Sequence, residues 1–176
     1  MITKRLSKVF IERNILKGPN FAGLPGNSTE SPVHILNMLI ENAKEEKKEI
    51  WILFQDIKKA FDSVSLESLE IALRRLKIPE KIIKYIINLS HERQLKIITA
   101  YGLTEEIKAG DGIDQGEVIS PLLWRIFYDP LLDRIQNKTE LGYTISYKTT
   151  SESQFALQRE YRQAAIAYAD DITWIA

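Results

Sequence analysis

Two adjacent carboxylates, Asp170 and Asp171, lie between two apolar segments near the end of the sequence. Residues 165–168 and 172–175 are rich in Ala, Ile, Tyr and Trp, so they predict a β-hairpin whose turn carries Ala169, Asp170 and Asp171. An unpaired carboxylate held against apolar surface is unfavourable by several kcal/mol, and two neighbouring carboxylates also repel each other. Such a turn therefore either projects into water or holds a cation.

A third acidic residue follows an apolar segment earlier in the chain. Residues 50–55 (IWILFQ) predict a strand buried on both faces, and Asp56 comes directly after it. Ligands bind at strand ends in sheets that are covered by helices. If this strand lies beside the hairpin, Asp56 meets Asp170 and Asp171, although 114 positions separate Asp56 from Asp170 (170 − 56).

The types of these side chains indicate which cation they would hold. A set of oxygen ligands without His or Cys suits Mg²⁺ or Mn²⁺ rather than zinc. Few protein ligands per ion leave positions for water and for substrate phosphates, which is the arrangement used in two-metal phosphoryl transfer. Simpler interpretations stay open on the residue types alone. An acidic dipeptide in a turn is most often solvated, and Asp56 could instead cap a short helix over residues 57–61.

Three segments of the chain resemble, in order, the palm motifs of reverse transcriptases. They are residues 54–64 (FQDIKKAFDSV), 112–123 (GIDQGEVISPLL) and 168–171 (YADD). Residues 23–29 (GLPGNST) are similar to the fingers loop that precedes the first palm strand. The style of the motifs is that of non-LTR retrotransposons, and among these of the jockey-like group.

The resemblance implies an α+β fold of the right-hand polymerase type. We expect a palm in which helices pack on an antiparallel sheet, with partial fingers and no thumb. The implied division places fingers helices in residues 1–48 and the palm in residues 49–176, truncated after the hairpin. We therefore expect the chain to be a fragment of a longer enzyme. The irregular mixture of helices and strands expected along the sequence agrees with an α+β fold.

The resemblance also implies roles for individual residues. It makes Asp56, Asp170 and Asp171 the catalytic and metal-binding residues, with Asp171 the more peripheral ligand. The implied cofactor is Mg²⁺ or Mn²⁺. Its implied reaction is RNA-directed DNA synthesis, in which a primer 3′-hydroxyl attacks the α-phosphate of a dNTP and expels pyrophosphate. The implied partners are an RNA template, a DNA primer and a dNTP.

Four further residues match substrate-binding positions of the family. Phe61 matches the aromatic residue that excludes a ribose 2′-hydroxyl by steric clash. Gln115, with Gly112 and Gly116 on either side, matches the motif that supports the templating base and the incoming nucleotide, and glycine allows close backbone approach there. The simpler alternatives are a core aromatic residue at position 61 and an ordinary Gly-rich loop before a helix.

The chain departs from the family pattern at two positions in the second motif. Asp114 stands where the family often has a basic or small residue, and an acid there weakens the local attraction for phosphate. Glu117 stands where small or apolar residues are common. Both departures bear on whether the chain is fully active.

Two other functions compete with the polymerase hypothesis. A truncated retroelement remnant would keep the palm fold without catalysis, and the neutral charge and the expected absence of a thumb favour it. A metal-dependent cyclase or nuclease could share a similar palm. Residues 112–121 argue against the cyclase or nuclease, because in the resemblance this segment belongs to templated polymerases.

The composition sets further bounds. The chain has 176 residues, and this length is enough for one domain with a core. Hydrophobic residues make up 44% of it and charged residues 27%. Because cysteine is absent, disulfides and Cys-ligated zinc are excluded. No apolar segment reaches the length of a membrane span and the start lacks a signal peptide, so we expect an intracellular protein of the nucleus or cytoplasm. The 24 basic and 24 acidic residues give no basic surplus for nucleic-acid binding.

Helix caps and hydrophobic periodicity predict the remaining elements. The expected helices are residues 3–16, a helix from the Ser31 cap and Pro32 to about residue 48, one from the Ser65 cap to about 76, one from Pro79 to about 89, and one from Ser120 and Pro121 to about 135. The expected strands are a hairpin around Gly102 and residues 142–148, with 149–153 as a loop and 154–163 ambiguous. The strand at Trp174–Ala176 is expected to have an unprotected edge.

Overall fold

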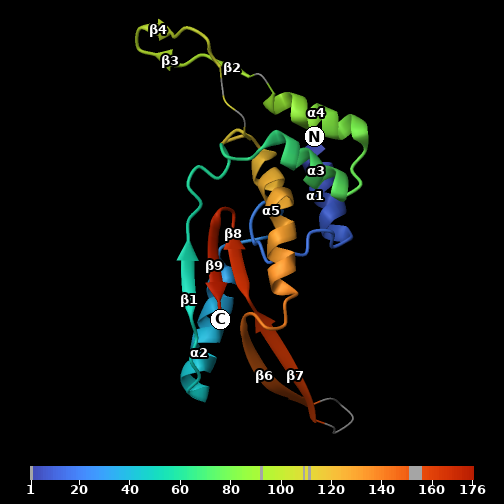
Figure 1. Cartoon of the computed structure of the whole chain (residues 1–176), viewed down its shortest axis with the longest axis vertical. Helices are drawn as coiled ribbons and strands as arrows, with labels where there is room; N and C mark the ends of the chain where they lie inside the picture. Colours follow the sequence, from blue (N-terminus) through green and yellow to red (C-terminus); the bar gives the residue numbers. More distant parts are fainter. Residues whose placement is uncertain (1, 92, 109, 111, 151–155) are drawn as a thin grey trace. The chain divides into compact units, whose positions relative to one another are not determined.

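The structure is a computed structural model that describes residues 2–91, 93–108, 110, 112–150 and 156–176. Its elements mix helices with antiparallel strand pairs, which confirms the expected α+β fold (Figure 1). In chain order they are α1 (Ile2–Glu12), α2 (Glu30–Glu46), β1 (Ile52–Gln55), α3 (Leu66–Arg75), α4 (Glu80–Ser90), β2 (Gln94–Leu95), β3 (Ile98–Thr99), β4 (Gly102–Leu103), β5 (Ile107–Lys108), α5 (Ser120–Gln136), β6 (Tyr143–Thr150), β7 (Ala156–Gln163), β8 (Ala165–Tyr168) and β9 (Asp171–Ile175).

The chain forms two compact units. The helical unit comprises Met1–Ile15 and Lys58–Phe127, and the sheet unit comprises Leu16–Ile57 and Tyr128–Ala176. Helix α5 contributes its first part to the helical unit and its second part to the sheet unit. The proposed division into fingers and palm after residue 48 is a functional assignment and stays a prediction.

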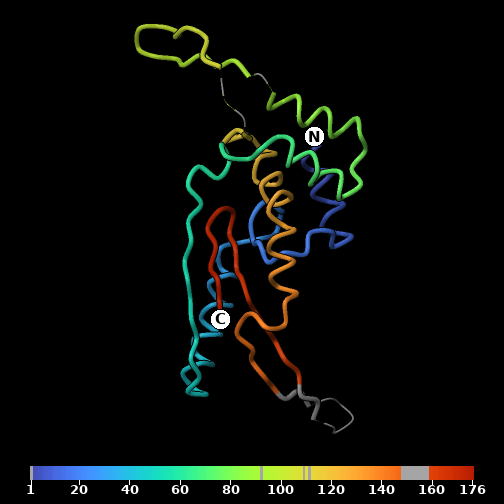
Figure 2. The backbone as a smooth tube through the Cα atoms, in the orientation of Figure 1, coloured from blue at the N-terminus to red at the C-terminus, as the bar shows by residue number. Residues whose placement is uncertain are grey.

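The sheet unit is built on a three-stranded antiparallel sheet in the order β1-β9-β8. The backbone tube shows β1, in cyan, running beside the red β8–β9 hairpin (Figure 2). Alternate residues of a strand face opposite sides, so each face takes its own set of apolar side chains. On one face Ile166 and Ile175 join Leu39 and Ala43 of α2. On the other face Ala165, Ala167 and Ile172 join Leu132 of α5.

A second hairpin, β6–β7, extends the core of the sheet unit. Its strands pair from Tyr143 with Gln163 to Thr150 with Ala156, so the ambiguous sequence before Gln163 is a strand from Ala156 onward. The expected loop at 149–153 is wrong for residues 149 and 150, which lie in β6, and residues 151–153 lie outside the described part. Tyr143 packs in the α2 cluster, and its hydroxyl donates to Asn42 Oδ1 at 3.0 Å.

In the helical unit, most elements begin where the sequence predicts. Ser65 caps α3 as expected, since its Oγ accepts the Ser68 amide at 3.3 Å. Pro79 is the N-cap of α4, and α5 begins at Ser120 as expected. The hairpin expected around Gly102 consists of two short ladders, β2–β5 and β3–β4, and it turns at residues 100–101, because Gly102 itself pairs with Thr99.

Two helix ends differ from the expectation. Helix α2 begins at Glu30 with Thr29 as its N-cap, so the prediction of Ser31 as the cap is wrong. Pro32 still lies in the first turn, where its missing N–H interrupts no helical hydrogen bond. The predicted helix 3–16 ends early, because α1 stops at Glu12 and Asn14 adopts a positive φ of 45°.

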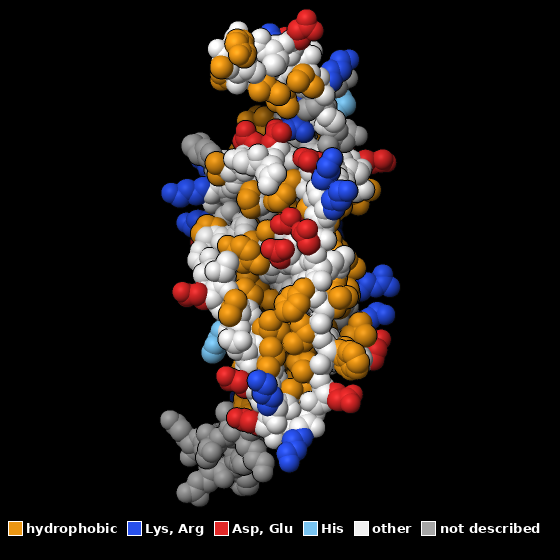
Figure 3. Space-filling model, turned by 90° about the vertical axis from the view of Figure 1, so that its left-hand side faces the viewer, with side chains coloured by type: hydrophobic (Ala, Val, Ile, Leu, Met, Phe, Trp, Pro, Cys, Tyr) orange, Lys and Arg blue, Asp and Glu red, His pale blue; other side chains and the backbone are white. Residues whose placement is uncertain are grey.

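The environment of β1 corrects one further expectation. Residues 50–55 were predicted to form a strand buried on both faces, but Leu53 is 63% exposed and Phe54 70% exposed, because β1 is an edge strand that pairs with β9 alone among the described strands. A space-filling view shows hydrophobic side chains gathered at the surface and a group of acidic side chains among them (Figure 3). The apolar sequence therefore identified a strand, but not what covers it.

Strand β9 corrects the opposite expectation. We predicted an unprotected edge at Trp174–Ala176, but β9 is the central strand and has β1 on one side and β8 on the other. The pairing even continues past β9, because the backbone of Ala176 exchanges hydrogen bonds of 2.7 and 3.0 Å with Trp51. The edge strands of this sheet are β1 and β8.

Candidate catalytic site

Asp56 and Asp171 lie at the same end of the three-stranded sheet. Strand β1 pairs antiparallel with β9, and the last pair of the ladder is Gln55 with Ile172. Continuing this register by one residue sets Asp56, the residue after β1, opposite Asp171. The structure therefore brings the end of β1 to the acidic turn, as the sequence predicted, and the 57–61 helix that Asp56 was to cap is absent there.

The acidic turn joins β8 to β9 through two residues, Ala169 and Asp170. Tyr168 pairs with Asp171 across the turn. Ala169 has a positive φ of 55°, whereas Asp170 is not among the residues of positive φ. A positive φ at the first central residue alone is typical of a type II′ turn, whose twist suits a two-residue hairpin. The predicted hairpin is confirmed with Ala169 and Asp170 in its turn, whereas Asp171, also expected in the turn, is the first residue of β9 and pairs with Tyr168.

The acidic side chains differ in exposure. Asp56 and Asp171 are exposed, and Asp170 is half-buried. Beside Asp171 and Tyr168 a cavity of about 260 Å³ separates the sheet from the start of α2, where Val33 and Leu36 line it. Val33 itself is 58% exposed. The carboxylates are thus accessible to a solute, and apolar side chains surround one of them.

The donor chemistry of Asp56, Asp170 and Asp171 fits a hard divalent cation. All three offer carboxylate oxygens, and the chain contains no cysteine that would favour zinc. As the side chains stand, the described part of the chain holds no group of three or more His, Cys, Asp or Glu side chains gathered closely enough to bind an ion. Asp56 and Asp171 are exposed, and the metal-binding role of the three acids stays a prediction.

Helix α5 packs against one face of the β8–β9 hairpin. Leu132, Ala165, Ala167 and Ile172 form one buried cluster, and Tyr128 packs at its border. Burial raises the pKa of the Tyr128 phenol above its ordinary value, so this group stays neutral at physiological pH. The strands that carry the acidic turn are therefore fixed by apolar packing on a rigid helix.

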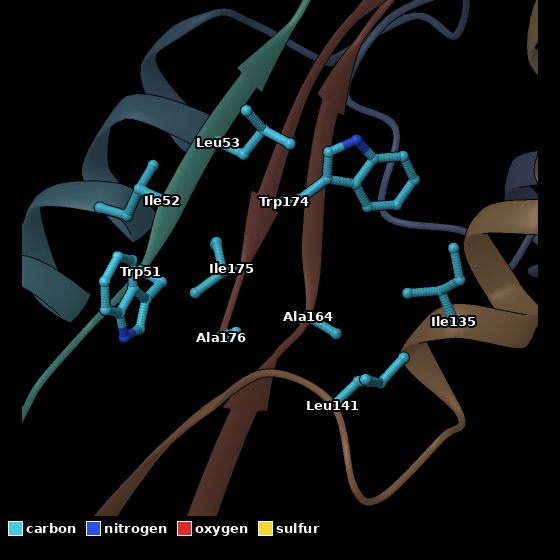
Figure 4. Close-up of a pocket in the computed structure, with 9 residues that line it drawn as sticks. All are labelled: Trp51, Ile52, Leu53, Ile135, Leu141, Ala164, Trp174, Ile175 and Ala176. Carbon is cyan, nitrogen blue, oxygen red and sulfur yellow. The ribbon is translucent and has the colours of Figure 1, made fainter.

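An apolar pocket of about 440 Å³ lies at the other end of the sheet. Trp174 and Ile175 of β9 line it together with Trp51, Leu53 and Ile135, and a close-up shows the Trp174 indole between the sheet and α5 (Figure 4). By the register, this pocket lies at the end of β9 that is remote from Asp171. Its apolar lining provides no groups for a triphosphate.

The predicted substrate-binding residues Phe61 and Gly112 lie together in the helical unit. The Ile113 amide donates to the Phe61 carbonyl at 3.0 Å. Gly112 has a φ of 122°, and a Cβ there would lie 2.7 Å from the Asp62 carbonyl oxygen, so only glycine fits. The Phe61 ring packs on Trp124, with ring centroids 5.8 Å apart. The contact with Trp124 agrees with the simpler alternative of a packed aromatic residue, and it leaves the steric role of Phe61 a prediction.

The middle of the second motif is open to solvent. Gln115, Gly116 and Glu117 are all exposed. Gly116 has a φ of 107° with open space around it, so its backbone conformation, rather than close packing, favours glycine there. The assignment of Gln115 and Gly116 to substrate binding stays a prediction.

The sequence analysis did not identify Arg93, although its side chain contacts two residues of the second motif. Its guanidinium forms an ion pair with Asp114, the residue whose acidity departs from the family pattern. The same side chain donates to the carbonyls of Ser90 and Gly112 at 3.2 and 3.3 Å. Asp114 therefore has a cationic partner within the chain. No sequence spacing could have identified this pair, because residues 93 and 114 come from separate segments.

Asn20 and Asp129 were also missed. Asn20 is 3% exposed and donates to the Ala169 carbonyl in the acidic turn, and Asp129 is 2% exposed and accepts the Gly18 amide. A buried polar residue with partners in distant segments has no local sequence pattern. The only signal was the presence of polar residues within otherwise apolar or loop sequence.

No helix in the described part of the chain is long and apolar enough to cross a membrane.

Comparison with known proteins identifies relatives over nearly the whole chain. A retrovirus-related Pol polyprotein from the type-1 retrotransposable element R2 of Nasonia vitripennis is 27% identical over 167 residues, which are 94% of this chain and 15% of that protein. The corresponding R2 protein of Popillia japonica is 30% identical over 78% of this chain and 18% of its own length. A probable RNA-directed DNA polymerase from transposon BS of Drosophila melanogaster is 29% identical over 72% of this chain and 14% of its own length. The chain thus spans less than a fifth of the length of these curated relatives.

Solved structures with a similar fold include telomerase from Candida tropicalis. The complex with a TWJ fragment of telomeric RNA superposes with a TM-score of 0.63 over 99% of this chain and 28% of that chain, at 13% identity. Apo telomerase of the same organism gives a TM-score of 0.61 over 99% of this chain and 31% of that chain, at 10% identity. These similarities concern the fold. The family profile described as reverse transcriptase (RNA-dependent DNA polymerase) matches residues 1–176. The chain therefore belongs to the reverse transcriptase family, and its relatives include non-LTR retrotransposon proteins.

Proposed function

We propose that this chain supplies the catalytic carboxylates of an RNA-directed DNA polymerase, which extends a DNA primer by templated nucleotidyl transfer. The observation that carries the proposal is the register of β1 and β9, because its last pair, Gln55 with Ile172, brings the end of β1 to the acidic turn. Family membership over the whole chain supports the reaction type. The same carboxylates on an isolated turn would support nothing beyond a solvated hairpin.

Asp56 and Asp170 would be the principal ligands of Mg²⁺ or Mn²⁺, and Asp171 the more peripheral one. When bound, these ions would neutralise charge that develops on phosphate oxygens and would lower the pKa of an attacking hydroxyl. The three carboxylates would hold the ions at the end of the sheet, where the strands fix the backbone of each residue. The half-buried position of Asp170 supports its role as a principal ligand.

The helical unit would contribute substrate contacts. Phe61, joined to the Gly112 loop by the Ile113 amide, would limit the space beneath the sugar of a dNTP. Gln115 and Gly116 are exposed and would be free to contact a nucleotide or templating base. Pairing of Asp114 with Arg93 would reduce the repulsion between this acid and a phosphate.

An RNA template, a DNA primer and a dNTP would be the substrates. The RNA-bound telomerase structure with a similar fold and the names of the retrotransposon relatives support an RNA template. The zero net charge of the chain gives no general attraction for nucleic acid. Binding by the chain alone is therefore expected to be weak and strongly dependent on salt.

A primer-extension assay tests the proposal. The complete enzyme of which this chain is expected to be a fragment, with Mg²⁺, an RNA template, an annealed DNA primer and dNTPs, is compared with its Asp56→Asn and Asp170→Asn variants. Because removing groups that merely orient metal ligands lowers activity about 10–100-fold, loss of a ligand itself is expected to lower extension at least about 100-fold. Asp133→Asn is the matched control, since Asp133 lies in α5 and pairs with Asn137. Extension that persists in either site variant would contradict the assignment.

A further inference from the structure

The segment before α2 forms an additional strand-like contact on the free edge of β8. The Ala167 amide donates to the Pro19 carbonyl at 2.9 Å, and the Phe21 amide donates to the Ala167 carbonyl at 2.8 Å. Asn20 lies between these two bonds as an isolated parallel bridge to Ala167. The backbone of Asn20 is therefore fixed beside the strand that leads into the acidic turn.

The Asn20 side chain reaches from this position to the turn itself. Its Nδ2 donates to the Ala169 carbonyl at 3.1 Å, while its Oδ1 accepts the Ala22 amide at 2.9 Å. Both ends of the buried amide are thus used, which also sets the orientation of the amide group. The Ala169 carbonyl belongs to the peptide unit that joins Ala169 to Asp170. Holding this carbonyl fixes the peptide plane on which Asp170 is carried.

Helix α5 anchors the same segment from the other side. The Gly18 amide donates to the buried Asp129 carboxylate at 2.8 Å. Gly18 also approaches α5 so closely that a Cβ there would lie 2.7 Å from Leu132 Cβ. The path of contacts therefore runs from α5 through Gly18 and Asn20 to the Ala169 peptide. Each step is a hydrogen bond or a close backbone approach, so the path has little freedom.

We infer that Asn20 is a positioning residue for the acidic turn, and that its amide holds Asp170 in the orientation needed beside Asp56. The effect on the turn stands on the contacts alone, whereas the effect on ion binding rests on the proposed function. A two-residue turn whose first residue has a positive φ and is not glycine lies in a strained backbone conformation. Loss of the Asn20 bond removes one restraint on the Ala169–Asp170 peptide.

Two substitutions separate this role from a general contribution to stability. Asn20→Ser keeps an oxygen that can accept the Ala22 amide, since serine forms the same kind of local turn, but its hydroxyl is too short to reach the Ala169 carbonyl as well. Asn20→Asp keeps the size and the acceptor and removes the donor. Tyr143→Phe is the matched control, because it removes one partly buried hydrogen bond of 3.0 Å in the same unit.

Amide hydrogen exchange of the 176-residue chain provides the direct test. Because loss of one hydrogen bond is a change of roughly 1.4 kcal/mol, or tenfold in an equilibrium constant, we expect exchange at the Asp171 amide, which pairs with Tyr168 across the turn, to be about tenfold faster in Asn20→Ser. Exchange in β1 should change less than about twofold after correction for global stability. Tyr143→Phe should leave the turn unchanged. Equal changes at the turn and in β1 in both Asn20 variants would overturn the inference.

A second measurement links the turn to ion binding. The Mn²⁺ dissociation constant, measured by electron paramagnetic resonance, is expected to rise several-fold in the uncharged Asn20→Ser variant and to stay within twofold in Tyr143→Phe. An unchanged constant in Asn20→Ser would overturn the functional part of the inference. If the unmodified chain binds no Mn²⁺, the proposed function fails, and the exchange result still decides whether Asn20 positions the turn.

Discussion

Gln55 pairs with Ile172 at the last step of the antiparallel ladder between β1 and β9. This single register relationship sets Asp56 opposite Asp171, because each acid is the neighbour of one member of the pair. A shift of the register by one residue would turn the side chains of β1 to the opposite face. The candidate site therefore depends on how β1 is aligned, which makes the contacts that fix this alignment the natural targets for mutation.

The Trp174 side chain is one contact that fixes β1. Its Nε1 donates to Gln55 Oε1 at 2.6 Å, between residues 119 positions apart. Trp174→Phe removes this bond and part of the ring that lines the apolar pocket, so we expect the free energy of unfolding to fall by about 1–2 kcal/mol. Urea denaturation measures the change. Trp51→Phe is the control, because Trp51 is 70% exposed, and an equal loss in both variants would contradict the role of the Trp174 bond.

The turn residue Ala169 offers a test of backbone strain. Ala169→Gly removes the steric cost of a positive φ, about 1 kcal/mol, but makes the unfolded chain more flexible, so we expect stability to stay the same or to rise slightly. Ala165→Gly, at a fully buried strand position in the same hairpin, should instead cost about 1–2 kcal/mol. Thermal unfolding of the two variants distinguishes them, and a similar loss at both positions would speak against the described turn.

Gly112 allows a structural role to be separated from a substrate role. Gly112→Ala places a Cβ 2.7–2.9 Å from backbone atoms of Asp62 and strains a φ of 122°, so we expect a loss of about 2 kcal/mol or more. Gly110→Ala is the matched control in the same loop, because among the described residues no atom lies within 4 Å of the new Cβ. Denaturant unfolding should show little change for the control. Full stability of Gly112→Ala would mean that the loop packs differently.

Arg93 should stabilise the second motif. Arg93→Gln removes the ion pair with Asp114 and weakens the bonds to the Ser90 and Gly112 carbonyls, so we expect a loss of about 1–2 kcal/mol. Asp114→Asn removes only the charge of a partly exposed partner and should cost less. Unfolding free energies of the two variants give the comparison. If Asp114→Asn lowered the free energy of unfolding more than Arg93→Gln, the carbonyl contacts of Arg93 would not contribute to stability.

Local patterns in the sequence predicted the elements and the acidic turn well. The hairpin at Ala169 and Asp170, the cap at Ser65 and the long helix from Ser120 each depend on residues close in sequence, and the structure contains all three. The predicted start of α2 was wrong by two residues. Thr29 and Ser31 are both residue types suited to an N-cap, and only one of them can begin the helix.

Exposure and contacts between distant residues could not be predicted from the sequence. An apolar segment shows that β1 is a strand, yet exposure depends on what lies beside it, and Phe54 proved to be 70% exposed. The contacts of Asn20 with Ala169 and of Arg93 with Asp114 join residues far apart in the chain, so no local sequence pattern predicts them. The family resemblance supplied the acidic residues but not the groups that hold them in place.

The most direct test of the candidate site is a Mn²⁺ titration followed by the NMR signals of the backbone amides. Paramagnetic broadening depends on distance from the ion, so one shared site should broaden the signals of Asp56 and of Asp170 at the same low Mn²⁺ concentration. In Asp170→Asn the broadening near Asp56 should weaken in parallel. Broadening confined to the turn, with the Asp56 signal unaffected up to saturation, would contradict a shared ion site.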